Sequence, residues 1–298
     1  MVDIHSHTVY SDGSDTVEEI LIKANESELT YFSITDHNTV DAYYDSAMRK
    51  KDELFFGNLI TGVEITTIYN GEIVEVLGYG IDTDIMRVKL EEKVYSFRKK
   101  QLLEFELIKN TYSKKGLDID FESISFDPNT SSSRKAIWEK IVEDDHLVKK
   151  LSESSSIQSS SNFTRQEVYN PESIFYVDQS TLYPSLKEAV QMIHDSKGIA
   201  LLAHLFIYGR SQEIKNDLLN IIDDSGLDGL ECYHSSFTFE QSQELIDFCN
   251  KNNLLISGGS DYHGARKPDI KLGEGKGNLD IPISIFAKWP SVIREKFF

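Results

Sequence analysis

Short apolar segments alternate with longer amphipathic segments at both ends of the chain. The apolar segments have the length of buried strands, and the amphipathic ones repeat their apolar positions with the period of a helix. Asp15 to Glu18 resembles a capping box, and Asn70-Gly71 is typical of a β-hairpin turn. The pattern predicts strands over residues 2–5, 31–35, 59–67, 73–79, 199–203, 229–233 and 254–257, and helices over residues 17–28, 41–55, 185–197, 211–225 and 239–252.

This alternation predicts an α/β fold whose parallel strands form a barrel. The rhythm breaks in the middle of the chain, where two charged helical stretches precede the serine-rich segment Ser152 to Asn162. That segment is so polar that we expect a flexible loop. We expect a barrel built from residues 1–83 and 184–298, with residues 84–183 as an inserted helical lid subdomain over its mouth. The alternative is that the insertion is a separate domain with its own function.

The composition favours a soluble cytoplasmic protein. The chain has 298 residues, of which 40% are hydrophobic, enough for a sizeable core. No apolar run approaches the roughly 18 residues that a membrane span needs, and the first residues lack the features of a signal peptide. Cys232 and Cys249 are the only cysteines, which suits a reducing compartment.

The charge of the chain bears on its partners. A formal net charge of -18 should repel long phosphate backbones, so we expect no duplex nucleic acid as a partner. A small anionic substrate remains compatible, because bound metal ions can dominate the local field. The alternative interpretation of most of this charge is that it keeps the protein soluble. No particular oligomeric state is favoured.

Histidines gather at the ends of the predicted strands. His5 and His7 are two positions apart, so a strand directs both imidazoles to the same face, and Gly13 permits a turn that points Asp12 back toward them. His146 and His194 fall within predicted helices, where we interpret them as structural. The other six of the eight histidines lie at or just beyond a strand end, namely His5, His7, His37, His204, His234 and His263.

Such a pattern predicts a metal centre. The carboxyl ends of barrel strands converge on one mouth, where these histidines would meet Asp12, Glu64 and Asp261. Nitrogen and carboxylate ligands without thiolates suit manganese, iron or zinc. The candidate ligands are too many for one ion, so we expect two or three divalent metal ions. Paired ions are typical of phosphoester cleavage.

Five short motifs occur in an order typical of a known family. They read D-I-H-S-H-T-x-x-S-D-G, I-T-D-H-N-T, G-V-E-I, L-A-H and G-S-D-Y-H-G, beginning at Asp3, Ile34, Gly62, Leu202 and Gly259. With them the chain resembles the PHP (polymerase and histidinol phosphatase) family, and in particular its stand-alone metal-dependent phosphoesterases. The resemblance covers Met1 to about Tyr79 and Tyr183 to about Leu279. It implies a distorted (β/α)7 barrel with a trinuclear metal centre.

The resemblance also implies a set of metal ligands. The first ion would be held by His5, His7, Glu64 and Asp261. Glu64 would bridge to a second ion that His204 also binds, and the third would be held by Asp12, His37 and His263. Asp3 and Asp36 are interpreted as groups that orient histidines from behind. The alternative for Asp3 is a polar residue of the barrel floor.

The chain departs from the family at three places. Glu75 stands where similar phosphoesterases carry a histidine ligand of the second ion, and Leu205 stands where they often have proline. Their Arg-Pro-His segment corresponds to Arg134-Lys135-Ala136. We predict that Glu75 ligates the second ion, and the alternative is an ordinary solvated carboxylate.

The activity that follows is hydrolysis of a phosphomonoester of a small molecule, with a nucleotide as the expected substrate. A hydroxide bridging two metal ions would attack phosphorus, next to Asp12 and His37 as catalytic residues. His234 would protonate the leaving group or contact the substrate. Arg134 and Arg210 would clamp the phosphate, and the alternative for either is a surface arginine.

Other functions fit part of the same pattern. A histidinol-phosphate-type phosphatase or a related amidohydrolase-type barrel would use the same kind of metal site on another bond. An exonuclease is disfavoured because the acidic composition provides no basic groove for a long strand, but short oligonucleotides remain possible substrates. A metal-stabilised binding domain without turnover is favoured only by the substitution at Glu75.

Overall fold

The computed structural model of the chain describes residues 1–208 and 211–294. These residues divide into two compact units: a barrel unit of residues 1–69, 73–92 and 184–298, and a helical unit of residues 70–72 and 93–183. The sequence pattern placed the start of the insertion at residue 84, whereas most of α3 (Thr83–Lys93) belongs to the barrel unit. None of the described helices is long and apolar enough to cross a membrane.

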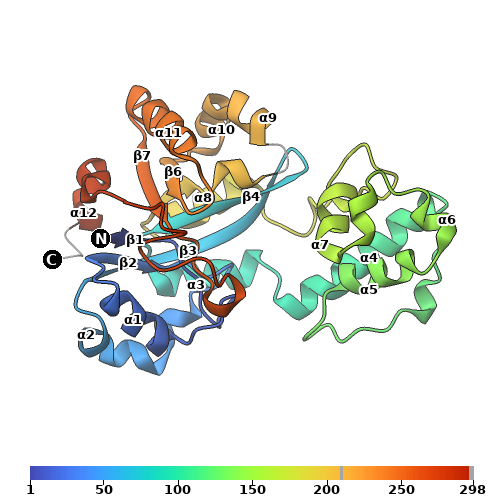
Figure 1. Ribbon diagram of the computed structural model, residues 1–298, viewed down its shortest axis with the longest axis horizontal. Coiled ribbons are helices and arrows are strands. Elements are labelled where there is room, and N and C mark those ends of the chain that lie inside the picture. The colour runs from blue at the N-terminus through green and yellow to red at the C-terminus, as the bar shows by residue number, and fades with distance from the viewer. Residues whose placement is uncertain (209–210, 295–298) are drawn as a thin grey trace. The chain divides into compact units, whose positions relative to one another are not determined.

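In the barrel unit, seven described strands form one sheet in the order of the sequence (Figure 1). The pairs β1–β2, β2–β3, β5–β6 and β6–β7 are parallel, whereas β4 runs antiparallel to β5. The sheet nearly closes, because β7 lies next to the start of the chain. Ile4 N, directly after β1, donates a hydrogen bond to Gly258 O of β7. The strands are β1 (Val2–Asp3), β2 (Tyr31–Ile34), β3 (Asn58–Tyr69), β4 (Glu72–Tyr79), β5 (Ile199–Leu202), β6 (Gly229–His234) and β7 (Leu255–Gly259).

The predicted distorted (β/α)7 barrel is therefore confirmed, and the distortion has a local cause. β3 and β4 are joined by the predicted turn at Asn70-Gly71, where both residues have positive φ angles (47° and 81°). This conformation suits asparagine and glycine. The hairpin reverses the chain, so β4 is the strand that breaks the parallel order.

Helices of the barrel unit follow most of the predicted segments. The first begins at Val17 as predicted, but its capping box lies one residue later than predicted, because Thr16 is the cap and Glu19 its partner. The prediction of a single helix over residues 41–55 is wrong. Asp45 adopts an extended conformation and its side chain caps a new turn, which leaves two 3₁₀ segments before a short helix. The helices are α1 (Val17–Glu26), α2 (Lys51–Leu54), α3, α8 (Leu186–Asp195), α9 (Ser211–Asn216), α10 (Leu218–Ser225), α11 (Phe239–Lys251) and α12 (Ser291–Arg294).

An apolar core fills the barrel away from its polar residues. Leu77 of β4, Leu201 of β5 and Ile4, which directly follows β1, pack with Trp289 from the C-terminal segment. The indole of Trp289 is 1% exposed and donates to Ile256 O at 3.0 Å. Burial of such side chains stabilises the fold by roughly 1.5–3 kcal/mol each, which offsets the cost of the buried polar groups at the other positions.

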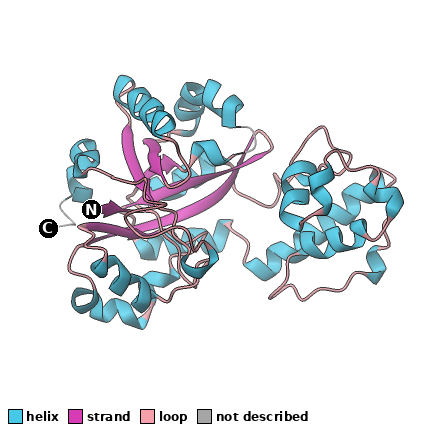
Figure 2. Cartoon of the chain, in the orientation of Figure 1, coloured by secondary structure: helices cyan, strands magenta, loops and turns pink. Residues whose placement is uncertain are grey.

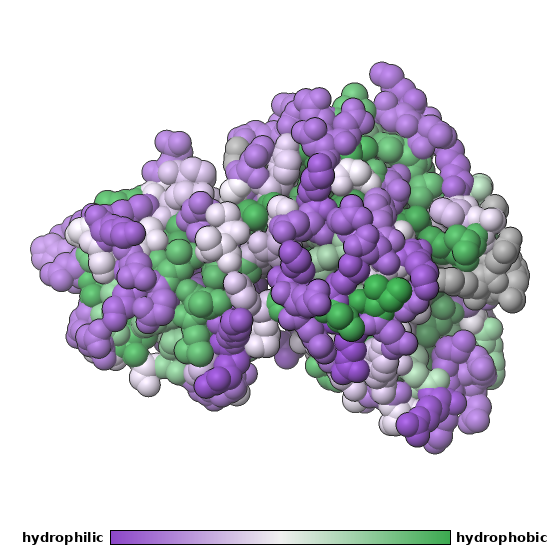
Figure 3. Space-filling model, turned by 180° about the vertical axis from the view of Figure 1, so that it is seen from behind, coloured by the Kyte–Doolittle hydropathy of each residue, from purple (hydrophilic) through white to green (hydrophobic). Residues whose placement is uncertain are grey.

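The helical unit has a core of its own, and its elements over residues 93–183 are helices joined by long loops and turns (Figure 2). Tyr112, Phe163 and Phe175 pack together, with ring centroids 5.6 Å and 5.7 Å apart. Its elements are α4 (Phe97–Lys114), α5 (Ser133–Val142), α6 (Asp145–Val148), α7 (Ser160–Phe163) and the π-helix Thr164–Val168. On the face drawn in Figure 3, hydrophilic side chains predominate and apolar ones form scattered groups.

The prediction that Ser152 to Asn162 is too polar to pack is wrong. The segment contains a 3₁₀ turn and α7, and it is organised by the fully buried carboxylate of Glu167. Glu167 Oε1 accepts hydrogen bonds from Ser152 N at 2.8 Å and Ser156 Oγ at 2.9 Å. Ser156 is therefore buried and the segment is held in place because the buried carboxylate of Glu167 satisfies its donors.

Candidate metal centre

The barrel strands bring all nine predicted metal ligands into the barrel unit. Histidines and aspartates follow β1, β2, β5 and β7, whereas Glu64 and Glu75 lie inside the long strands β3 and β4. His5, His7 and Glu64 are each 0% exposed. Burial of so many ionisable groups is costly unless they are paired or bind a cation, so their contacts define the chemistry of the site.

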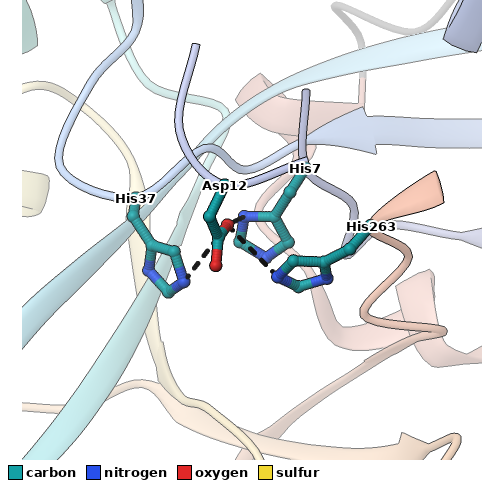
Figure 4. Close-up of side chains that lie close together, drawn as sticks. All are labelled: His7, Asp12, His37 and His263. Carbon is teal, nitrogen blue, oxygen red and sulfur yellow. Dashed lines mark ion pairs between the residues drawn. The ribbon is translucent and has the colours of Figure 1, made fainter. Parts of the chain in front are cut away.

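Asp12 stands between three imidazoles (Figure 4). Its Oδ1 lies 3.2 Å from Nε2 of His263 and 3.6 Å from Nδ1 of His7. Nε2 of His37 is 3.8 Å away. The Asp12 side chain is 50% exposed, so this group of ligand-type atoms is reachable from solvent.

Glu64 occupies the middle of the remaining histidines. Its Oε2 lies 3.1 Å from Nδ1 of His37 and 3.3 Å from Nε2 of His7. The same oxygen is 3.4 Å from Nε2 of His5. Its Oε1 lies 2.9 Å from Nε2 of His204. One carboxylate therefore touches four imidazoles, which is the arrangement expected of a bridging ligand.

Four overlapping groups of potential ligands occur in the described part of the chain. In each group the ligand-type atoms all lie within 4.8 Å of one another. The groups share residues, so they form one continuous centre. They are His7, Asp12, His37 and His263; His5, His7 and Asp261; His5, Glu64 and His204; and His37, Glu64 and Glu75.

Several buried polar atoms of these residues have no hydrogen-bond partner, and they indicate whether the residues fit metal ions. Among the described residues, Nε2 of His5, Nε2 of His7, Nδ1 of His37 and Oε2 of Glu64 are buried without a hydrogen-bond partner. Buried polar atoms nearly always have partners. Several orphaned nitrogen and oxygen donors aimed at one another fit divalent cations, and the absence of thiolates suits manganese, iron or zinc.

The electrostatics of the centre point the same way. Burial alone would raise the pKa of Glu64, but the charges on His37 and His5 hold it well below its ordinary value. Burial and the charge of Glu64 raise the pKa of Glu75, so this carboxylate needs a cation nearby to ionise at low cost. His204 would be made less basic by burial, but its hydrogen bond to Glu64 raises its pKa to about 9.

The family model for the PHP domain matches residues 3–225. The chain belongs to the PHP domain family. The match includes four of the five motifs that suggested the resemblance, together with the strands that carry them.

Three relatives cover nearly all of this PHP chain. A 5'-3' exoribonuclease of Haemophilus influenzae is 25% identical over 99% of the chain and 98% of its own length. A phosphoribosyl 1,2-cyclic phosphate 1,2-diphosphodiesterase of Eggerthella lenta is 23% identical over 88% of the chain and 94% of its own length. A 3',5'-nucleoside bisphosphate phosphatase of Chromobacterium violaceum is 22% identical over 88% of the chain and 87% of its own length.

A solved structure shares the fold. The amidohydrolase from Chromobacterium violaceum, with bound sulfate and no metal, superposes with a TM-score of 0.64 at 20% identity and covers 96% of each chain. At this identity the likeness shows the fold alone.

Sequence reasoning missed Glu231, which supports two of the PHP histidines. This residue of β6 is 0% exposed. Its Oε1 lies 2.8 Å from Nδ1 of His5, and its Oε2 accepts from His204 N at 2.9 Å. A proton on Nδ1 of His5 leaves Nε2 free to face Glu64. The signal was an acidic residue inside the apolar strand sequence G-L-E-C-Y.

The interpretation of Asp3 and Asp36 needs correction. Neither accepts a hydrogen bond from an imidazole in the described structure. Asp3 Oδ1 accepts from Ser260 N at 2.9 Å and its Oδ2 accepts from Gly273 N at 2.8 Å. Asp36 accepts from the backbone and hydroxyl of Thr8. Both carboxylates therefore hold the loops that carry the ligands, rather than the imidazole rings.

Strained backbone occurs where the chain leaves the strands of the centre. His204 and Asp261 have φ angles of 20° and 57°, and Asn38, directly after His37, has 57°. Non-glycine residues rarely adopt positive φ, and such conformations concentrate at functional sites. The strained backbone directs the side chains of His204 and Asp261 into the barrel mouth.

The departure at Glu75 lies at the centre itself. Its Oε1 is 3.4 Å from Nδ1 of His37, and its Oε2 is 3.4 Å from Nε2 of His204. Thr66 Oγ1 donates to Oε1 at 3.2 Å. The side chain is 19% exposed, so the alternative of an ordinary solvated carboxylate is not supported by its surroundings.

His234 and Lys267 both meet Asp261. Nε2 of His234 lies 3.5 Å from Asp261 Oδ2, and its Nδ1 accepts from Ser236 N at 3.0 Å. Burial lowers the pKa of His234, which favours a neutral ring with its proton on Nε2. Lys267, a residue that sequence reasoning missed, donates from Nζ to Asp261 Oδ2 at 2.6 Å. It places a cation directly beside the candidate ligands.

The two predicted phosphate-binding arginines have different outcomes. Arg134 lies in the helical unit, where its Nε is 3.3 Å from Glu104 Oε1 and its Nη1 donates to Tyr169. It is therefore held within that unit and is not an ordinary surface arginine. Arg210 lies outside the described residues. His146 and His194 are in none of the four ligand groups.

Proposed function

We propose that this PHP protein hydrolyses a phosphomonoester of a nucleotide at a centre of two or three divalent metal ions. The observation that carries the proposal is the set of orphaned imidazole and carboxylate atoms around Glu64. The coarser class, a metal-dependent phosphoric ester hydrolase, is common to its relatives of different substrate preference, and this chain is an enzyme of that class.

Three sets of residues would hold the ions. Glu64 belongs to two of them, which would place two ions side by side. Ions bound there would lower the pKa of a water molecule and neutralise charge on a phosphoryl group. The sets are His5, His7, Glu64 and Asp261; His204, Glu64 and Glu75; and Asp12, His37 and His263.

The remaining residues would position and orient these ligands. Glu231 fixes the proton of His5 on Nδ1, so the lone pair of Nε2 faces inward. Lys267 balances part of the negative charge of Asp261 and lies where a phosphate would approach. His234 would present its Nε2 proton beside Asp261, in reach of a leaving-group oxygen.

Two of the three relatives, the bisphosphate phosphatase and the exoribonuclease, support a nucleotide as the substrate, and they leave two forms of it open. The bisphosphate phosphatase acts on a free nucleotide by its name. The exoribonuclease name and its 99% coverage of this chain favour a second candidate, removal of nucleotides from a short RNA. The net charge of -18 disfavours long polyanions, because a surface of the same sign repels them.

A phosphate-release and product screen with added manganese tests the proposal. Its substrates are nucleoside mono- and bisphosphates, a ribose cyclic phosphate, sugar phosphates, histidinol phosphate and a short 5'-phosphorylated RNA. We expect phosphate release from a nucleotide that stops with chelator. Mononucleotide products from the RNA would instead establish the second candidate. Failure of metal-loaded protein to cleave any of these esters would overturn both.

A further inference from the structure

We infer that a cavity beside β6 binds the planar base of the substrate nucleotide; this inference rests on the proposed function. The cavity has a volume of about 470 Å³ and is lined by the end of β6, the start of α11 and residues 278–282. All of these belong to the barrel unit. The volume suits a small organic group, and its position next to the metal centre suggests which one.

His234 connects the cavity with the metal centre. It lines the cavity, and its Nε2 lies 3.5 Å from Asp261 Oδ2. Its ring centroid is 6.3 Å from that of His5 and 5.1 Å from that of Phe237. A substrate with its phosphate at the metal centre and its base in the cavity would therefore carry its sugar beside this one imidazole.

Aromatic side chains give the cavity a preference for a flat ring. Phe237 and Phe239 both line it, and Phe239 is 78% exposed. Phe56 is equally exposed at 78% but is not part of the cavity, so exposure alone does not distinguish Phe239. What distinguishes it is its place on the wall of a hollow beside the metal centre. All nucleobases can stack on aromatic side chains, because every base has a flat π-face.

Charge excludes the phosphate as the occupant. Asp280 lines the cavity, and its carboxylate would repel a phosphate while accepting a hydrogen bond from an amino group of a base. Ser242 adds a hydroxyl to the same wall. Asn278 is already used to hold the wall, since its Nδ2 donates to Ser235 O at 3.1 Å. The lining thus fits an uncharged planar base and directs the phosphate toward the metal centre.

The test compares a nucleotide with its base-free counterpart. For Phe239→Ala, the ratio of kcat/KM for adenosine 5'-monophosphate to that for ribose 5-phosphate should fall at least about fivefold, the effect of losing one base–aromatic stack. Phe56→Ala is the matched control and should leave the ratio unchanged. An unchanged ratio in Phe239→Ala, or an equal fall in both variants, would overturn the inference.

A binding measurement separates this inference from the proposed function. Adenosine has a base but no phosphate, so its binding to the metal-loaded protein, followed by calorimetry, does not depend on hydrolysis. We expect binding to wild type and to Phe56→Ala, and at least about fivefold weaker binding to Phe239→Ala. If no nucleotide is hydrolysed, the proposed function fails, but the adenosine measurement still decides whether the cavity binds a base. Equal adenosine binding by all three proteins, or none by wild type, would reject it.

Discussion

Two buried carboxylates, Glu64 in the barrel unit and Glu167 in the helical unit, have the same exposure and opposite surroundings. Both are 0% exposed. Glu167 accepts hydrogen bonds from backbone and side-chain donors of the serine-rich segment and from Ser173. Glu64 Oε2 has no hydrogen-bond partner among the described residues and instead faces imidazole nitrogens from three directions.

The difference separates a structural cluster from a binding one. Around Glu167 the donors and acceptors satisfy one another, so the cluster is complete and holds the fold together. Around Glu64 most neighbours are potential ligands whose lone pairs converge, so a bound cation would satisfy them. Burial of a charged residue is thus uninformative by itself, and the state of its hydrogen bonds decides what it does.

The largest effect that follows from this comparison is expected for His7→Ala. His7 contacts both Glu64 and Asp12, so its loss should damage two ion positions together. We expect elemental analysis of purified protein to give less metal per chain than wild type. Turnover should fall by more than the roughly 10–100-fold typical of residues that only support a ligand.

The control for this variant is His194→Ala. His194 lies in α8 and pairs with Asp228 at 2.8 Å, so it should keep its metal and turnover. Wild-type protein prepared without chelation should carry more than one equivalent of metal. Full activity in a metal-free preparation, or full metal content in His7→Ala, would contradict the assignment of the Glu64 cluster.

The sequence was enough to bring the ligands of that cluster together, because their placement is local. Alternation along a strand puts His5 and His7 on one face, and parallel strands carry their ends to one mouth. Glu231 was missed because the face on which it lies depends on the closure of the barrel. The packing of Ser152 to Asn162 was missed for a different reason, since its acceptor, Glu167, lies outside the segment and is 15 residues from Ser152 and 11 from Ser156.

A smaller effect, on stability rather than on metal content, is expected for Glu167→Ala. Removal of this acceptor leaves the buried hydroxyls of Ser156 and Ser173 unsatisfied, at a cost on the order of 1–3 kcal/mol, and also frees the backbone of Ser152. Limited proteolysis should then cut first within Ser152 to Asn162, whereas in wild type this segment should resist. The number of bound metal ions should not change.

Glu172→Ala is the matched control for that experiment, because Glu172 is an exposed glutamate in the same unit. It should leave both the free energy of unfolding and the cleavage pattern as in wild type. Early cleavage of the serine-rich segment in wild type would show that Glu167 does not hold it. Loss of metal in Glu167→Ala would show that the two clusters are not independent.

Glu75 lies between the two kinds of cluster and gives the finest test of the comparison. Its carboxylate accepts a hydrogen bond from the hydroxyl of Thr66, as Glu167 does from serines, and it also faces the imidazoles of His37 and His204, as Glu64 does. If it is a ligand, it serves mainly the ion shared with His204. A carboxylate there brings a hard, anionic oxygen in place of the imidazole nitrogen of similar enzymes, which favours manganese, iron or magnesium over zinc.

Glu75→Ala should therefore lose one metal ion while the others stay bound, with turnover reduced by at least about tenfold, because even residues that only support a ligand cost roughly 10–100-fold when replaced. Glu75→His should retain that ion and shift its preference toward zinc, because imidazole nitrogen is the softer donor. The manganese and zinc content of both variants is measured by elemental analysis after equilibration with equal concentrations of the two metals. Unchanged stoichiometry in Glu75→Ala, with an unchanged metal preference in Glu75→His, would place Glu75 with the satisfied carboxylates and leave the second ion without it.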